Sequence, residues 1–219
     1  MEIKDLTVVI ATFKSENKIY TCLDSLPVTT RILVIENSNN HKFKEEINRR
    51  YSNVECILLG KNKGYSIANN TGLQKVITRF TATIWADQIY IENETINKTI
   101  IYFEKSKSLF TFPVFFKKNP YTKIIRNKSK KFLDIVQSKE IDYTLKSGES
   151  DCGFFIFKTS KIRKLIKYLI NKKMIFSKKS NEIEFLSTFK YIRKLGKITT
   201  VKAKNEKDTI GINFKKDLI

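Results

Sequence analysis

The chain has 219 residues, 41% hydrophobic and 29% charged, which excludes a disordered protein and suits one well-packed domain. Its longest apolar run (109–116) is too short to span a bilayer, and no signal peptide is expected. The three cysteines are scattered and form no C-x-x-C pair, which predicts reduced thiols in a cytoplasmic protein. The net charge of +20 is spread along the whole chain, which argues against nucleic-acid binding and favours a solvated basic surface. In one interpretation, this surface contacts the inner face of an anionic membrane.

The first eighty residues alternate apolar runs of strand length with helical patterns. Strands are predicted at 6–12, 31–36 and 54–59, because these runs are apolar on both faces. Helices are predicted between and after them, at 15–26, 43–51 and 65–77. This alternation predicts an α/β fold with a mostly parallel, Rossmann-like sheet and helices on both of its faces.

The next stretch, residues 81–87, is predicted to be a buried strand that ends in the carboxylate of Asp87. Ligands of open α/β sheets bind beyond the carboxyl ends of the strands. An aspartate at such an end can hold a divalent metal against phosphate oxygens. The alternative role for Asp87 is to cap the following helix.

The remainder of the chain has a looser pattern without an internal repeat or a linker, so we expect a single domain over residues 1–219. Helices are predicted at 92–105, 160–171 and 181–195. Strands are predicted at 109–116, 153–158, 198–203 and 209–213, with a small β-hairpin formed by 123–126 and 132–137.

Three segments of the first half resemble family 2 glycosyltransferases in their order and spacing, over residues 5–80: V-V-I-A-T-F-K (8–14), L-V-I-E-N-S (33–38) and N-K-G-Y-S-I-A-N-N-T-G-L (62–73). The resemblance implies that residues 1–85 bind the nucleotide of a sugar donor, most readily a UDP-sugar. Thr12 and Glu36 would contact the base and ribose, and Lys63, Gly64 and Asn69 would line the same pocket. Without the resemblance, Gly64 and Asn69 are ordinary turn and cap residues. Family 2 enzymes usually carry Asp-x-Asp at the strand end, whereas this chain has Trp85-Ala86-Asp87.

The second half resembles the uridylyltransferase domain of N-acetylglucosamine-1-phosphate uridylyltransferases, which shares the nucleotide-diphospho-sugar transferase (GT-A) fold. The similarity is carried by seven short segments in the same order: A-D-Q-I (86–89), E-T-I (94–96), N-P-Y-T-K-I-I-R-N (119–127), D-I-V-Q-S-K-E (134–140), E-S-D-C-G-F-F-I-F (149–157), N-E (181–182) and G-I-N-F-K-K-D-L (211–218). It implies that Asp87 and Asn213 hold Mg²⁺ or Mn²⁺, and that Thr122, Gln137 and Asp151 stand at sugar-binding positions. Residues 86–219 are therefore expected to form the metal and acceptor half. The glycine-rich loop with which these enzymes cradle a triphosphate is replaced by residues 11–14, A-T-F-K.

The sequence thus leads to a first hypothesis of a glycosyltransferase-like enzyme in surface-polysaccharide or glycolipid synthesis. It would use a nucleotide-sugar donor and a divalent metal, with Asp87 and the metal neutralising the departing diphosphate. Glu182 would act as the general base on the acceptor, and Glu184 is a second carboxylate in the same segment. Two alternatives stay open, a sugar-1-phosphate nucleotidyltransferase and a catalytically inactive module that binds nucleotide sugars.

Overall fold

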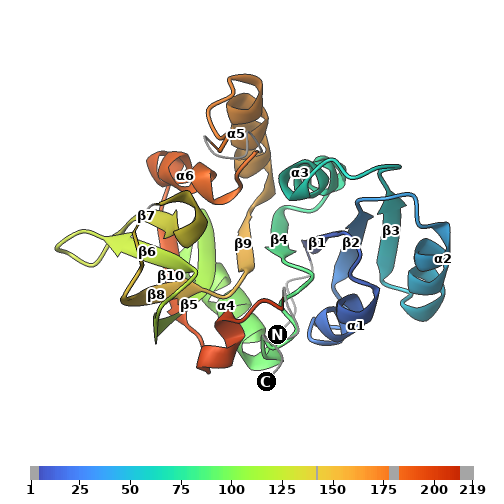
Figure 1. The fold of residues 1–219 in the computed structure, drawn as a ribbon, viewed down its shortest axis with the longest axis horizontal. Coiled ribbons are helices and arrows are strands. Elements are labelled where there is room, and N and C mark those ends of the chain that lie inside the picture. Colours follow the sequence, from blue (N-terminus) through green and yellow to red (C-terminus); the bar gives the residue numbers. More distant parts are fainter. Residues whose placement is uncertain (1–4, 142, 178–182, 213–219) are drawn as a thin grey trace.

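A central sheet runs through the whole molecule (Figure 1) in the computed structural model, which describes residues 5–141, 143–177 and 183–212. Its strand order is β10-β5-β9-β4-β1-β2-β3, and β8 pairs with β5 outside this path. The strands of this sheet are β1 (Leu6–Thr12), β2 (Arg31–Glu36), β3 (Val54–Leu58), β4 (Phe80–Ile84), β5 (Phe110–Lys118), β8 (Ser147–Asp151), β9 (Phe154–Lys158) and β10 (Ile198–Lys202).

The first four strands are parallel, so their carboxyl ends meet at one edge of the sheet. Strand β1 pairs with both β2 and β4, and β2 pairs with β3. All seven residues of β1 are buried, as expected for a β-branched, apolar strand that is covered on both faces. The register places Thr12 beside Glu36 at the carboxyl ends of β1 and β2.

Strand β9 joins the two halves of the chain into one sheet. It lies antiparallel between β4 and β5, and β10 then pairs parallel with the other edge of β5. The phenylalanines of β5 and β9 form an aromatic cluster, with Phe110 stacked on Phe157 at 5.3 Å between ring centroids and Phe189 packed edge-on at 4.8 Å. Burial of these large rings anchors the region on which the second half of the site is built.

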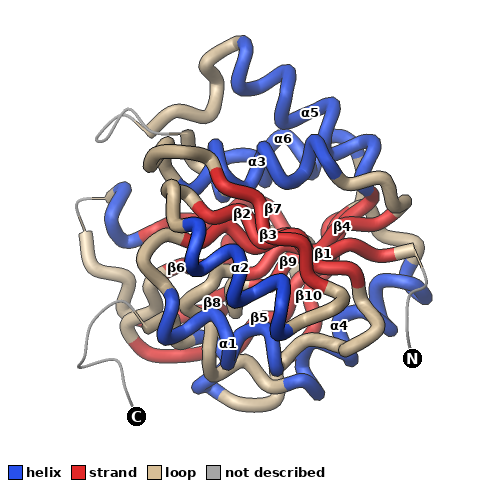
Figure 2. Tube along the Cα trace, turned by 90° about the vertical axis from the view of Figure 1, so that its right-hand side faces the viewer, coloured by secondary structure: helices blue, strands red, loops and turns tan. Residues whose placement is uncertain are grey.

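Helices cover both faces of the sheet, as predicted (Figure 2). Buried residues of α1, α2 and α4 share one core cluster, and those of α3, α5 and α6 pack on the opposite face. The helices are α1 (Glu16–Asp24), α2 (His41–Arg50), α3 (Tyr65–Lys75), α4 (Asn93–Ser106), α5 (Thr159–Asn171) and α6 (Phe189–Leu195). Short 3₁₀ helices occupy Ser138–Glu140, Leu186–Thr188 and Glu206–Thr209.

The predicted hairpin forms a separate two-stranded sheet from β6 (Thr122–Arg126) and β7 (Phe132–Gln137). Its register pairs Thr122 with Gln137, at the end where the hairpin joins the rest of the molecule. The hairpin packs against β8 and α6, while its tip projects to the left in Figure 1. The α/β class, the mostly parallel sheet and the hairpin are thus confirmed.

Four details differ from the sequence prediction. The strand expected over 81–87 ends at Ile84, and Ala86 and Asp87 form a turn. The helix expected over 181–195 is not helical at 183–185 and starts as a 3₁₀ turn at Leu186. The strand expected over 209–213 is absent from its described residues, because Thr209 ends a 3₁₀ helix and 210–212 are irregular. Strand β8 was not predicted, because Ser-Gly-Glu-Ser-Asp lacks a hydrophobic pattern.

Gly72 lies where α3 crosses β1 and β2, and Gly72→Ala is expected to destabilise the fold. A Cβ at this position would overlap the side chain of Val9 and lie 2.9 Å from Cγ1 of Ile35. Overpacking costs about 1–3 kcal/mol, and the better helix propensity of alanine offsets up to about 1 kcal/mol of it. Thermal melting should show a decrease in Tm of roughly 2–6 °C. The exposed Lys75→Ala in the same helix should leave Tm nearly unchanged, and equal Tm values for both variants would contradict this packing.

Candidate functional site

A cleft of about 1120 Å³ lies at the carboxyl ends of β1 and β4 and is lined by both halves of the chain. The first half contributes Lys14, Lys18, Lys63 and Gly64, and the turn after β4 contributes Asp87. The second half contributes residues of the hairpin, of β8, of the segment 183–186 and of the segment 209–212. Its position corresponds to the ligand crevice of open α/β sheets.

Asp87 lies in the turn that follows β4, where the C-terminal described segment returns to the sheet. The backbone N–H of Gln88 donates to the carbonyl of Trp85 at 3.0 Å and closes this turn. The N–H of Ile212 donates to the carbonyl of Asp87 at 3.0 Å, so the C-terminal segment runs across to the end of β4 (Figure 1). A Cβ at Gly211 would lie 3.1 Å from Oδ2 of Asp87, so a larger residue there would require the carboxylate to shift by a few tenths of an ångström.

The alternative role of Asp87 as a helix cap does not apply, because Glu92 is the N-cap residue of α4. The carboxylate of Asp87 is also close to Cys22 of α1. Burial raises the pKa of the Cys22 thiol to about 12, and the negative charge of Asp87 contributes to this increase. Asn213 and Glu182, two of the predicted site residues, lie outside the described residues. Ile212 nevertheless brings the chain to Asp87 one residue before Asn213.

Trp85 occupies the place of the first acidic residue of an Asp-x-Asp pair, and its partly buried indole lines the cleft. The ring contacts Tyr65 edge-on at 6.4 Å and Phe155 at 6.0 Å between centroids. Among the described residues, no group of three or more His, Cys, Asp or Glu side chains is placed to hold a metal ion. A Mg²⁺ or Mn²⁺ ion at this turn would therefore take Asp87 as its carboxylate ligand and fill the other positions with water and phosphate oxygens, which is the usual coordination of Mg²⁺ in nucleotide sites. The donor set fits that description.

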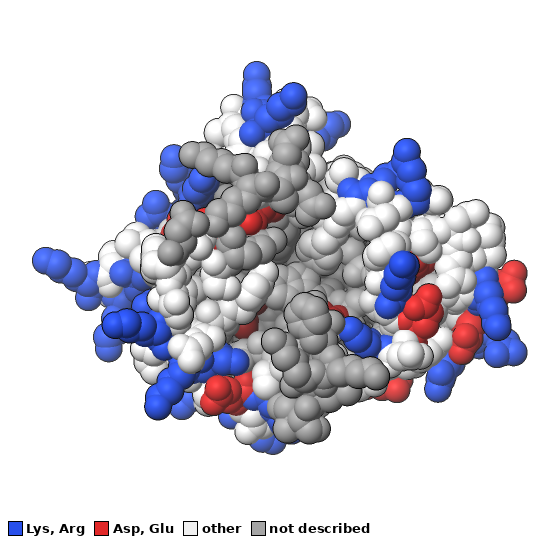
Figure 3. Space-filling view, viewed as in Figure 1, with Lys and Arg blue, Asp and Glu red and all other residues white. Residues whose placement is uncertain are grey.

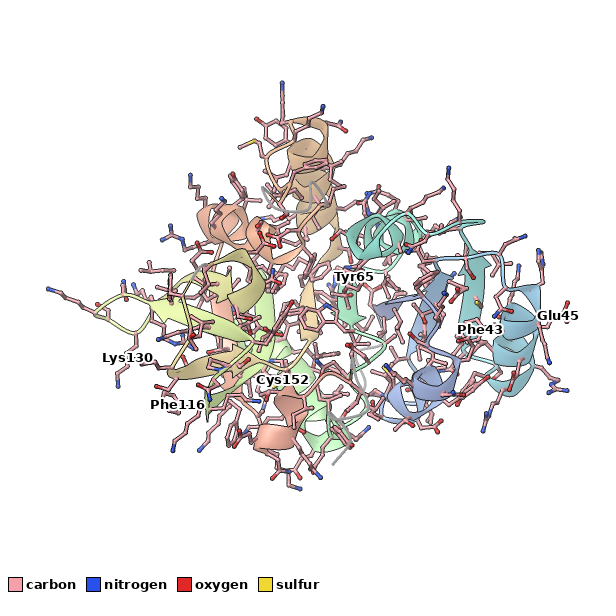
Figure 4. The ribbon with its side chains drawn as sticks, in the orientation of Figure 1. Phe43, Glu45, Tyr65, Phe116, Lys130 and Cys152 are labelled. Atoms are coloured by element: carbon pink, nitrogen blue, oxygen red, sulfur yellow. The ribbon has the colours of Figure 1, made fainter. Side chains whose placement is uncertain are left out.

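The first half gives the cleft a cationic wall next to Asp87. Lys14, Lys18 and Lys63 line it, and the Nζ of Lys18 donates to the carbonyl of Ile212 at 2.5 Å. Gly64 is the N-cap of α3 with φ of +83°, so the amino end of that helix opens toward the cleft beside Lys63. Figure 4 shows Tyr65, the first residue of α3, in the middle of the molecule between the two halves. Ammonium groups and a helix amino terminus together favour a phosphate ligand.

Two asparagines that were not singled out in the sequence hold this wall in place. The Nδ2 of Asn37 donates to Oδ1 of Asn62 at 2.8 Å, and the N–H of Lys63 donates to Oδ1 of Asn37 at 2.8 Å. The N–H of Gly64 donates to Oδ1 of Asn62 at 2.9 Å. Asn37 and Asn62 belong to the segments 33–38 and 62–73, which resemble known glycosyltransferases, so the sequence could have indicated both residues. Their mutual contact could not be predicted, because it depends on the pairing of β2 with β3.

Three predicted nucleotide-binding residues lie beneath the wall and do not line the cleft. Oγ1 of Thr12 is buried and has no hydrogen-bond partner within the described part of the chain. The carboxylate of Glu36 accepts a hydrogen bond from Ser38, and burial raises the pKa of Glu36. Oδ1 of Asn69 accepts from Oγ1 of Thr83 at 3.1 Å, which ties α3 to β4.

The three predicted sugar-binding residues all line the cleft on its other side. Oγ1 of Thr122 donates to Oδ2 of Asp151 at 2.5 Å, and the N–H of Gly153 donates to Oδ1 of Asp151 at 2.8 Å. Asp151 is buried, which raises its pKa, and both of its oxygens are used to join the hairpin to the β8–β9 turn. Gln137 lies opposite Thr122 in the hairpin register.

Glu184 is the described carboxylate on this wall that is best placed to contact a ligand. The Oγ of Ser187 donates to its Oε2 at 2.9 Å, and Nε2 of Gln137 lies 3.5 Å from its Oε1. The half-exposed Tyr121 lies close to Glu184. Partial burial raises the pKa of the Tyr121 hydroxyl, and the negative charge of Glu184 raises it further. The second half of the cleft therefore carries the carboxylates of Asp151 and Glu184 together with Lys117, whereas the first half carries three ammonium groups beside Asp87.

Comparison with known proteins gives both a family match and similar folds. The family model described as "Glycosyl transferase family 2" matches residues 7–190, which covers parts of both halves of the chain. A 4-diphosphocytidyl-2C-methyl-D-erythritol synthase from Anaerococcus prevotii superposes with a TM-score of 0.65 at 12% identity, over 99% of this chain and 96% of its own. A putative glucose-1-phosphate thymidylyltransferase from Bacillus anthracis also gives a TM-score of 0.65, at 14% identity, over 91% of this chain and 87% of its own.

HddC from Yersinia pseudotuberculosis gives a TM-score of 0.62 at 14% identity, over 96% of this chain and 95% of its own. No curated protein matches the sequence. At these identities the structural matches show the fold alone. Together with the family match, they confirm the nucleotide-diphospho-sugar transferase fold.

Proposed function

Because the chain belongs to glycosyl transferase family 2, we propose that it transfers a sugar from a nucleotide-sugar donor to a hydroxyl group of an acceptor. In this proposal the donor is a UDP-sugar, the metal is Mg²⁺ or Mn²⁺, and the product belongs to a surface polysaccharide or glycolipid. The observation that carries it is the division of one cleft into a cationic wall that includes Asp87 and a second wall that carries Glu184.

The cationic wall is suited to the diphosphate of the donor. Lys14, Lys18 and Lys63 provide positive charge, and Gly64 allows the first turn of α3 to approach the phosphates closely. Asp87 is the carboxylate that would hold a divalent cation on the same side. When bound, that cation supplies the positive charge that stabilises the departing nucleoside diphosphate.

The carboxylate wall is suited to the acceptor. A carboxylate in contact with the acceptor hydroxyl can remove its proton as the hydroxyl oxygen attacks the anomeric carbon of the donor. Glu184 is our candidate for this base, and Glu182, in the same segment, is the alternative. Ser187 fixes Oε2 of Glu184, while Thr122, Gln137 and Asp151 are proposed to hold a sugar ring beside it.

A nucleotidyltransferase is the second candidate, because the similar structures include a synthase and a thymidylyltransferase. These enzyme classes must position a triphosphate, a task done by a long glycine-rich loop. Here only Phe13, Lys14 and Ser15 connect β1 to α1, and none of them is glycine. We therefore expect no release of pyrophosphate from UTP and a sugar 1-phosphate.

Calorimetric titration tests the proposal directly. We expect UDP and UDP-sugars to bind when Mn²⁺ or Mg²⁺ is present, and to bind more weakly after chelation of the metal. Failure of every nucleoside diphosphate to bind with metal present would overturn it. Metal-dependent pyrophosphate release at a rate well above the blank would favour the nucleotidyltransferase instead.

A further inference from the structure

Helix α5 carries a basic surface that none of the residues assigned to the cleft explains. One side of the helix is buried through Ile162, Ile166 and Leu169. The opposite side is exposed and continues past the end of the helix. We call this surface the α5 basic face, and define it by five exposed lysines, Lys161, Lys164, Lys167, Lys172 and Lys173. In Figure 3 the Lys and Arg side chains gather at the top of the molecule, where Figure 1 places α5.

Among the residues that the structure describes, neighbouring carboxylates do not compensate the positive charge of this face. The sequence contains no Asp or Glu between Asp151 and Glu182. The elements that pack against α5 are α3, α6 and β9, and none of the three contains an acidic residue. Among the described residues, no ion pair involves the five lysines.

The other strongly basic region, around the β6–β7 hairpin, is different. There Arg126 forms an ion pair with Glu149, and Asp134 lies on β7 of the same hairpin. The acid-free surroundings therefore distinguish the α5 basic face from a surface that is merely rich in lysine. A surface of one charge sign attracts an extended surface of the opposite sign.

Two exposed side chains among the lysines favour a lipid surface as the partner. Tyr168 is 54% exposed and Met174 is 40% exposed, although both have large apolar parts. Tyrosine is enriched at the interface between lipid headgroups and hydrocarbon, and basic helical faces with such residues bind anionic membranes. The exposed cations are all lysines, whereas nucleic-acid phosphates are preferentially bound by the planar fork of arginine.

We propose that the α5 basic face docks this protein onto the surface of an anionic lipid bilayer. Within the described part of the chain, no helix has the length and hydropathy of a membrane span, so this contact would be made at the bilayer surface. Phe176 follows α5 closely and lines the cleft together with Glu184 and Phe185. Docking therefore brings the rim of the cleft near the bilayer. A lipid-linked acceptor would then lie within reach of the cleft, and this consequence rests on the proposed function.

Vesicle flotation tests the proposal with two variants that remove the same charge. Lys161→Gln/Lys164→Gln/Lys167→Gln neutralises three of the five lysines of the α5 basic face. Lys128→Gln/Lys130→Gln/Lys131→Gln neutralises exposed lysines near the hairpin tip, where Figure 4 labels Lys130. The unmodified protein should float with vesicles of phosphatidylcholine and phosphatidylglycerol, and not with pure phosphatidylcholine. The α5 variant should bind on the order of 100-fold more weakly, at roughly fivefold per lysine, and the hairpin variant should stay close to the unmodified protein.

Thermal melting checks that both variants are folded, which is expected because all six lysines are exposed. Absence of the unmodified protein from the floated anionic vesicles would overturn the proposal. Equal losses in the two variants would also overturn it, because they would assign binding to net charge alone. Binding to duplex DNA that depends on the α5 lysines, without vesicle binding, would replace the membrane by nucleic acid. Metal-dependent UDP titration of the α5 variant reports on the proposed function separately and should be unchanged.

Discussion

Asp87→Ala is expected to abolish the metal-dependent part of nucleotide binding. The other charged side chains that line the first half of the cleft are the ammonium groups of Lys14, Lys18 and Lys63, which cannot ligate a cation. Loss of a group that merely orients a metal ligand costs about 10- to 100-fold in metal affinity, so loss of the ligand itself should cost more. Titration of UDP with Mn²⁺ and after chelation measures the effect: the gain in affinity with metal should disappear.

The matched control is Asp24→Ala, which removes an exposed aspartate of α1 that accepts a hydrogen bond from Tyr51 and does not line the cleft. It should preserve the metal-dependent gain. Asn213→Ala should weaken that gain less than Asp87→Ala, because an amide oxygen carries no net charge to hold a dication. Metal-dependent binding that survives Asp87→Ala would place the ion elsewhere, and the turn after β4 would lose its proposed role.

The parallel half of the fold could be predicted closely because its strands are apolar on both faces. Strands β1 and β2 begin and end at the predicted residues, since Leu6–Thr12 and Arg31–Glu36 are nearly unbroken runs of residues that favour strands. Helix α5 was also predicted to within one residue, because its apolar residues repeat at helical spacing. Local pattern was sufficient wherever one element is buried in the same way along its whole length.

Elements that depend on contacts between distant segments could not be predicted. Strand β8 is polar, and it is a strand because β5 offers an edge for antiparallel pairing. The strand predicted through Asp87 stops at Ile84, where the chain turns, and the backbone of Trp85 there bonds to Gly153. The contact between Ile212 and Asp87 likewise joins segments that have no mutual signal in the sequence.

In the candidate site, too, local sequence segments could be predicted, whereas contacts between distant segments could not. The segments that resemble known families indicated the lysine wall and the residues around Asp151, but not how they are held. The Asn37–Asn62 hydrogen bond that supports Lys63 spans two loops, and Glu184 lies in a segment whose predicted helix does not form at that point. The contrast between the cationic and the carboxylate wall is visible only once both halves are folded around one cleft.

Glu184→Gln is expected to lower kcat by about 10²- to 10⁴-fold, the usual contribution of a general base. Glutamine has nearly the same shape, and its side-chain oxygen can still accept the hydrogen bond from Ser187. Binding of UDP with metal should therefore be unchanged, because the donor wall lies on the other side of the cleft. Release of UDP from the UDP-sugar identified by titration gives the rate, including the slow reaction in which water takes the place of the acceptor.

Two further variants separate the base from residues that only shape the cleft. Ser187→Ala removes the hydrogen bond to Oε2 of Glu184 and should reduce kcat much less than Glu184→Gln, because the carboxylate itself is retained. Glu182→Gln should retain activity if Glu184 is the base. A large loss in Glu182→Gln together with normal turnover in Glu184→Gln would reverse the assignment. That result would leave the assignment of the donor wall unchanged, because that wall rests on the lysines and on Asp87.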